Sequence, residues 1–151
     1  MAYSDLTPAQ KRSLDELYCK PFANNERLEE LFQNINKVVI KKGGVYDGKA
    51  IGHTIELSLE SKTDIDSLIK ALHIEEPKEV VYCMCAGSYA LELFNSSTLK
   101  GTIGLHHGRT IRYEGWKGDA RLVNGLGLLT LIASRGYKQP LKDFMEDRED
   151  T

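Results

Sequence analysis

The chain of 151 residues is 41% hydrophobic and 28% charged, with a formal net charge of −2. This composition is typical of one folded domain with a hydrophobic core and excludes a disordered chain. The acidic balance argues against a nucleic-acid partner, and the lack of any apolar run near ~20 residues excludes a membrane-spanning protein.

The first forty residues predict helices. Thr7 before a proline is typical of a helix start, because the threonine hydroxyl caps a free amide and proline fits the first turn. A second helix is expected to begin at Asn24 or Asn25, because apolar residues recur at helical spacing after this point. We expect residues 1–40 to form the helical N-terminal part of a single domain that covers residues 1–151.

Residues 53–136 predict the α+β part of this domain. Apolar and polar residues alternate from His53 to Glu60, as in a strand, and residues 61–74 predict a helix. The run "EVVYCMC" is apolar on both faces, so it predicts an inner strand. Three further runs joined by short polar turns predict an antiparallel meander, followed by a leucine-rich helix. We therefore expect an α+β fold with two N-terminal helices and an antiparallel sheet of four to five strands, with helices packed on one face.

The stretch "GLHHGRTIRYEGW", residues 104–116, contains two histidines, two arginines and the only tryptophan. A three-residue loop, His107-Gly108-Arg109, pairs residue 105 with residue 111 and directs the apolar residues of both strands to the core. A two-residue loop would instead place polar residues beside core leucine and isoleucine, at a cost in free energy. We therefore expect the three-residue loop, with Gly108 in the left-handed conformation.

This register places His106 and Arg112 together on the solvent face, with the small Gly104 between them and Glu92 within reach. An arginine fork and a titratable imidazole suit an anion or a carboxylate, so this face predicts a binding site. The alternative is an ordinary sheet surface, in which Arg112 pairs with a neighbouring glutamate. The residues predicted to form the binding site are His106, His107, Arg109, Arg112, Trp116, Asp119 and Glu92.

The cysteines allow two other chemistries. Cys83 and Cys85, with His106 from a nearby strand, would supply two thiolates and an imidazole, a set that suits zinc. The enzymatic alternative is a Cys83 or Cys85 nucleophile with His106 as its base and Glu92 as the residue that orients this base. However, a C-x-C pair on a central strand is typical of core packing, and adjacent histidines on a strand point to opposite faces. We therefore expect no metal and no catalytic residue; if a metal is present, Cys83, Cys85 and His106 are its predicted ligands.

Together, these motifs resemble a pattern of uncharacterised bacterial proteins. The pattern consists of C-x-C at residues 83–85, L-H-H-G-x-x-I-R at residues 105–112 and W-x-x-D-A at residues 116–120, followed by a leucine-rich helix. The resemblance implies that these residues form one unit, and it implies no particular activity.

We expect a cytoplasmic, non-enzymatic binding or inhibitory module that contacts a protein partner or an anionic ligand through residues 104–116, without a cofactor. The first residues lack the apolar stretch of a secretory signal, and three cysteines do not make a disulfide scaffold. An immunity protein fits this description, by analogy of build alone. The alternative function is a small enzyme or metalloprotein that uses Cys83 or Cys85 with His106 or His107.

Overall fold

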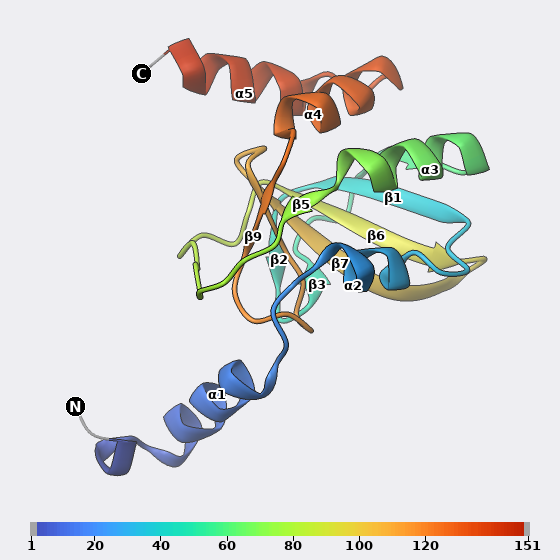
Figure 1. The fold of residues 1–151 in the computed structure, drawn as a ribbon. Helices are drawn as coiled ribbons and strands as arrows, with labels where there is room; N and C mark the ends of the chain where they lie inside the picture. The colour runs from blue at the N-terminus through green and yellow to red at the C-terminus, as the bar shows by residue number, and fades with distance from the viewer. Residues whose placement is uncertain (1–2, 150–151) are drawn as a thin grey trace.

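A computed structural model describes residues 3–149, apart from the side chains of residue 3, residues 15–18 and residues 148–149. It shows a seven-stranded sheet, a separate two-stranded hairpin and helices (Figure 1). The helices are η1 (Tyr3–Asp5), α1 (Pro8–Cys19), α2 (Asn25–Leu31), α3 (Lys62–Ala71), α4 (Gly125–Ser134) and α5 (Gln139–Glu149). The strands are β1 (Lys37–Lys42), β2 (Val45–Tyr46), β3 (Lys49–Ala50), β4 (Ile55–Leu59), β5 (Ile74–Glu75), β6 (Tyr89–Asn95), β7 (Thr98–His106), β8 (Thr110–Arg112) and β9 (Ala120–Leu122). In the described part of the chain, no helix has the length and apolar character needed to cross a membrane.

One hydrophobic core lies between the sheet and the helices. Alternate residues of the central strands, such as Leu91 and Ile103, are completely buried on one face of the sheet. Leu28 of α2, Leu68 of α3 and Leu128 of α4 belong to the same buried cluster. Helix α5 lies against α4, and α1 projects away from the rest of the molecule (Figure 1).

Four helices begin where a polar side chain caps the first turn. Thr7, as predicted, and Asn24, Ser61 and Asn124 each accept a hydrogen bond from the backbone amide three residues further along the chain. Each cap satisfies an amide that has no partner within the helix. The predicted start of the second helix, at Asn24 or Asn25, is therefore confirmed.

The strand order is β4-β1-β6-β7-β8-β9-β5, and every neighbouring pair is antiparallel. Strands β6 to β9 form a meander, so the predicted α+β fold is confirmed. The sheet has seven strands instead of four or five. Residues 37–42, at the end of the predicted helical part, form β1 between β4 and β6. The two strands at the other edge, β9 and β5, have three and two residues, too few to show a period in the sequence.

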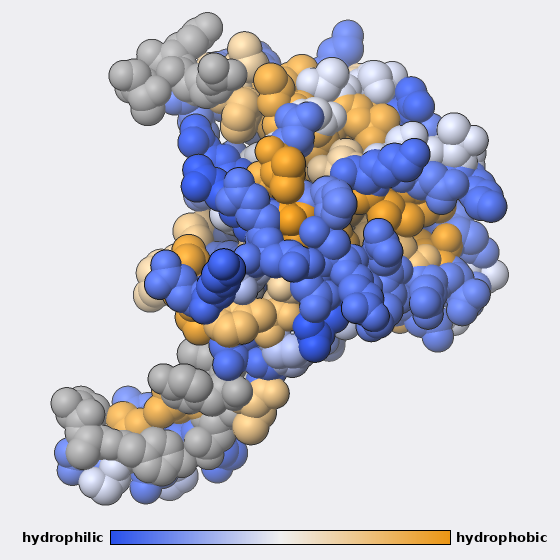
Figure 2. Space-filling view, viewed as in Figure 1, coloured by the Kyte–Doolittle hydropathy of each residue, from blue (hydrophilic) through white to orange (hydrophobic). Residues whose placement is uncertain are grey.

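The predicted inner strand "EVVYCMC" is wrong. Residues 76–88 form a loop without regular secondary structure, which we call the cysteine loop. Its apolar side chains are exposed: Val81 is 55% exposed and Met84 94%. Hydrophobic atoms are visible at the left edge of the space-filling view, where this loop passes (Figure 2). An apolar run on both faces is typical of a buried strand, but this run pairs with no strand, and its backbone forms hydrogen bonds with side chains and with single backbone groups of other segments.

The face of the sheet opposite the core is also covered. Glu92 lies opposite Thr102 across β6 and β7, and Gly104 and His106 continue the same face along β7. The β2–β3 hairpin lies over β6 and β7, so that a Cβ atom on Gly104 would be 3.4 Å from Val45. Glu92, Thr102 and His106 are buried on this face, under the hairpin and, at His106, also under the cysteine loop. The prediction of a solvent face is wrong here, because a hairpin that the sequence pattern did not reveal covers it.

Candidate metal centre

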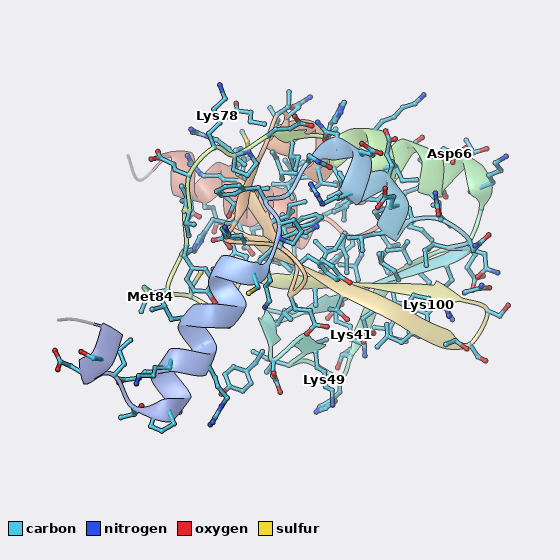
Figure 3. The ribbon with its side chains drawn as sticks, turned by 60° about the horizontal axis from the view of Figure 1, so that its bottom comes forward. Lys41, Lys49, Asp66, Lys78, Met84 and Lys100 are labelled. Atoms are coloured by element: carbon cyan, nitrogen blue, oxygen red, sulfur yellow. The ribbon has the colours of Figure 1, made fainter. Side chains whose placement is uncertain are left out.

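The cysteine loop brings two thiols to the turn between β7 and β8. Cys83 and Cys85 flank Met84 in the sequence of this loop, Met84 itself is exposed (Figure 3), and His106 is the last residue of β7. One ligand atom from each of Cys83, Cys85 and His106 lies within 4.8 Å of the other two. The three residues that the sequence analysis gives as ligands of a possible metal ion therefore lie close together.

Cys85 is the centre of the cluster. Its Sγ atom lies 2.8 Å from Sγ of Cys83, 3.2 Å from Nδ1 of His106 and 3.5 Å from Nε2 of His107. His107 has a φ of 56°, because it begins the turn and no longer belongs to the strand. The strand alternation ends there, so the two adjacent histidines approach the same thiol. The expectation that they point to opposite faces is wrong for this reason.

The β7–β8 turn has the predicted register. Leu105 pairs with Ile111, which leaves the three-residue loop His107-Gly108-Arg109, and the φ of Gly108 is 69°. The amide of Arg109 donates a hydrogen bond of 3.0 Å to the carbonyl oxygen of His106 and closes the turn. The turn holds both histidines beside the cysteine loop.

Arg112 and Asp119 fix the first half of the cysteine loop. Nε of Arg112 donates to Oδ1 of Asp119 at 2.5 Å, and Nη2 donates to Oδ2 at 2.9 Å. The other guanidinium contacts go to the loop backbone: Nη1 donates to the carbonyl of Cys85 at 3.0 Å, and Nη2 also donates to that of Cys83 at 2.5 Å. Oδ2 of Asp119 accepts the amide of Cys83 at 2.8 Å. We call Arg112 and Asp119 the loop clamp.

The second half of the loop is fixed by backbone contacts. The amide of Val45 donates to the carbonyl of Ala86 at 2.8 Å, and the amide of Ser88 donates to that of Leu105 at 2.9 Å. At Gly44, a Cβ atom would lie 2.0 Å from the carbonyl oxygen of Ala86, so this approach requires glycine. The loop is thus attached on both sides of the two thiols.

Burial keeps the imidazole of His106 neutral. The side chain is 1% exposed, and burial, with the positive charge of Arg112, lowers the pKa of His106 to about 4. Nε2 has no hydrogen-bond partner among the described residues, and Nδ1 faces the thiol of Cys85. A neutral imidazole is the form that binds a metal ion.

The two thiols differ in acidity. The hydrogen bond from Cys85 lowers the pKa of Cys83, and Arg112 acts in the same direction. Burial raises the pKa of Cys85. The thiolate that a metal ion needs is therefore easiest to form at Cys83.

Two thiolates and one or two imidazoles are a donor set for a borderline-soft divalent ion. Zinc sites in proteins combine cysteine and histidine in this way, with Zn–S bonds of about 2.3 Å and Zn–N bonds of about 2.0 Å. Cys83, Cys85 and His106 supply three donors, and Nε2 of the exposed His107 lies 3.5 Å from Sγ of Cys85.

The other predicted binding residues do not form one exposed patch. Trp116 is 5% exposed and packs edge-to-face on Tyr113 in the core. Glu92 is buried and pairs with Lys41, with Nζ 2.8 Å from Oε1. Arg112 and Asp119 are engaged with each other and with the loop. Of the seven predicted residues, His107 and Arg109 are exposed.

Arg109 lies at a second feature, an open cleft of about 640 Å³ beside the cysteine loop. Arg121 of β9 lines the same cleft, together with Thr110 and with glutamates of the segment that follows β5. Sequence reasoning missed this cleft, because the segment joining β5 to β6 was expected to be a strand. It also missed Tyr82, whose ring centroid is 3.9 Å from the guanidinium carbon of Arg112.

Comparison of the chain with protein-family models, with curated proteins and with solved structures finds no match. The resemblance to uncharacterised bacterial proteins stays a prediction. The site is therefore interpreted from its own geometry.

Proposed function

We propose that this protein binds one thiophilic divalent metal ion, of which Zn²⁺ is the best fit, through Cys83, Cys85 and His106. The observation that supports this function is the convergence of two thiols and a buried imidazole within 4.8 Å, from segments 21 positions apart. Burial keeps the imidazole neutral, and the loop clamp holds the backbone of both cysteines. Such preorganisation lowers the cost of bringing the ligands together.

His107 completes this proposed site as the fourth ligand. Its Nε2 atom is 3.5 Å from Cys85 Sγ, and its left-handed backbone turns the ring toward the thiol. Four protein ligands in a tetrahedral arrangement characterise structural zinc sites, whereas catalytic sites keep one position open for water. The proposed role of the ion is consequently structural: it joins the cysteine loop to the β7–β8 turn in a non-enzymatic protein.

The test is metal stoichiometry and affinity in the full chain. Protein purified without chelators is analysed by native mass spectrometry, and its Zn²⁺ affinity is measured by competition with a chromophoric chelator. We expect one ion per chain, and we expect Cys83→Ser, Cys85→Ser and His106→Ala each to lower the affinity by more than about a hundredfold. Cys19→Ser is the matched control, because Cys19 is an exposed free cysteine on α1 and should leave the affinity unchanged.

Absence of binding at saturating zinc in the reduced protein would overturn the proposal. Equal loss of affinity in Cys19→Ser and in the loop variants would also overturn it, because binding would then not depend on this cluster. Circular dichroism of each variant separates loss of a ligand from loss of the fold.

Binding of a small anion is a second candidate function, and the cleft beside the cysteine loop favours it. Arg109 and Arg121 are both exposed and line this cleft. Two guanidinium groups in one cleft suit a carboxylate or a phosphate, although the cleft is also lined by Glu75, Glu76 and Glu79. We expect inorganic phosphate or citrate to raise the melting temperature of the wild type and not that of the Arg109→Ala, Arg121→Ala double variant. The exposed Arg12 on α1 supplies the control substitution.

A further inference from the structure

We propose that Cys83 and Cys85 are also a site of reversible oxidation: they form a disulfide within the cysteine loop when they react with a low-molecular-weight disulfide. We infer that this oxidation and metal binding exclude each other, a part of the proposal that rests on the proposed function. The observation that carries the inference is the distance of 2.8 Å between the two Sγ atoms.

This distance lies between the two states. A disulfide bond has a length of about 2.04 Å, so the sulfurs must approach by about 0.8 Å. Two thiolates on one tetrahedral zinc, with bonds of about 2.3 Å, are about 3.8 Å apart, so the sulfurs must separate by about 1 Å. Both shifts are within reach of side-chain rotation in a loop. We therefore expect the disulfide and the metal-bound pair of thiolates to form on the same loop backbone.

The thiols are accessible to a small reagent. Both cysteines are partly exposed, and Met84 between them is 94% exposed. The segment has no regular secondary structure, and Tyr82 on its other side is 57% exposed. A thiol needs such access for exchange, whereas a buried structural cysteine is inert.

The reaction is a two-step exchange that needs no other component. One thiolate of the pair attacks a sulfur of the reagent R–S–S–R, the S–S bond of the reagent breaks, and one R–S⁻ leaves. The second thiolate then attacks the protein sulfur of the mixed disulfide and releases the other R–S⁻. The two cysteines lose two protons and two electrons in total, and the reagent is reduced to two thiols.

Oxidation removes two metal ligands at once. A thiolate binds zinc and a disulfide sulfur does not, so His106 and His107 alone would remain. Conversely, a bound ion keeps both sulfurs from exchange. With free zinc at about one hundred times the Kd, the fraction of metal-free protein falls about a hundredfold, and we expect the rate of disulfide formation to fall equally.

The test uses the full chain, with Cys19 as an internal control. Reduced, metal-free protein is incubated with oxidised glutathione, quenched with iodoacetamide and mapped by peptide mass spectrometry. We expect the peptide with Cys83 and Cys85 to lose two hydrogen atoms and to take up neither reagent. Cys19, which is exposed and has no neighbouring thiol among the described residues, should be alkylated or carry glutathione. Cys83→Ser should convert the remaining loop cysteine to a glutathione adduct.

Alkylation of both loop cysteines, or separate glutathione adducts on each, would overturn the disulfide. Repeating the reaction with Zn²⁺ separates the two proposals. An intraloop disulfide in a protein that binds no zinc would refute the proposed function and leave the oxidation site standing. Zinc binding in a protein that forms no intraloop disulfide would refute the oxidation site and leave the proposed function standing. A disulfide that forms at the same rate with and without bound zinc would refute their mutual exclusion.

Discussion

Replacing Asp119 by asparagine tests whether the loop clamp holds the metal ligands in place. The carboxylate is 1% exposed and accepts three hydrogen bonds, two from Arg112 and one from the amide of Cys83. Asparagine keeps the shape of the side chain, but it carries no charge and places an amide group against one of these donors. Arg112 is then left without a counter-ion, although its side chain retains an exposed fraction of 18%.

The expected cost is about 2–4 kcal/mol in the free energy of unfolding of the metal-free protein. Breaking a fully buried ion pair costs about 3–5 kcal/mol, and the partial exposure of Arg112 reduces this value. We also expect the zinc affinity to fall about tenfold to a hundredfold, since residues that orient metal ligands have effects of this size. Both quantities can be measured, the first by urea denaturation in the presence of a chelator and the second by chelator competition.

The matched control is Asp64→Asn. Asp64 pairs with Arg135 through one contact of the same kind, with Nε 2.7 Å from Oδ1, but the two side chains are 23% and 38% exposed. A surface pair of this kind contributes about 0–1 kcal/mol. The free energy of unfolding of the control should therefore fall by less than about 1 kcal/mol, and its zinc affinity should stay unchanged. If Asp119→Asn behaves like Asp64→Asn in both measurements, the clamp does not have the role described here.

Three further predictions follow from the geometry of the site. The pKa of His106 is lowered to about 4 in the folded protein, so the unfolded chain binds the extra proton first as the pH falls. The stability of the metal-free wild type should therefore decrease from about pH 6.5 to pH 4 by about 2–4 kcal/mol more than that of His106→Gln, in urea titrations at each pH. His107→Ala should keep the fold, because the side chain is exposed, and should lower the zinc affinity about tenfold or more in chelator competition; an unchanged affinity would mean that His107 is not a ligand. Gly44→Ala should displace the carbonyl of Ala86 and lower both stability and zinc affinity, whereas Gly101→Ala, where the nearest atom would be 3.4 Å away on a tyrosine ring, should change the affinity little.

The hairpin could be predicted from the sequence because its two possible registers differ in what they bury. A shift by one residue would have placed the polar side chains of Thr110 and Arg112 beside Leu105 and Ile103, which are both completely buried. The presence of β1 was harder to predict. Its three apolar residues are flanked by lysines, and Lys41 is partly buried through its ion pair with Glu92, a partner more than fifty residues away.

The cysteine loop could not be predicted, because long-range contacts between polar groups determine its path. Its apolar composition indicates a buried strand, but the backbone of Cys83 is bonded to the side chains of Arg112 and Asp119. The spacing of residues in the sequence does not predict these hydrogen bonds. The approach of both histidines to Cys85 depends in turn on the positive φ of His107. The predicted three-residue loop allows this φ, but the alternation of a regular strand predicts that the two side chains point to opposite faces.

The most direct measurement of the central claim is zinc K-edge X-ray absorption of the loaded, reduced wild-type protein. Two sulfur ligands at about 2.3 Å and two nitrogen ligands at about 2.0 Å are expected, with one sulfur lost in Cys85→Ser. A shell of nitrogen and oxygen alone, or the same spectrum in the wild type and in Cys85→Ser, would contradict a metal centre built from Cys83, Cys85, His106 and His107.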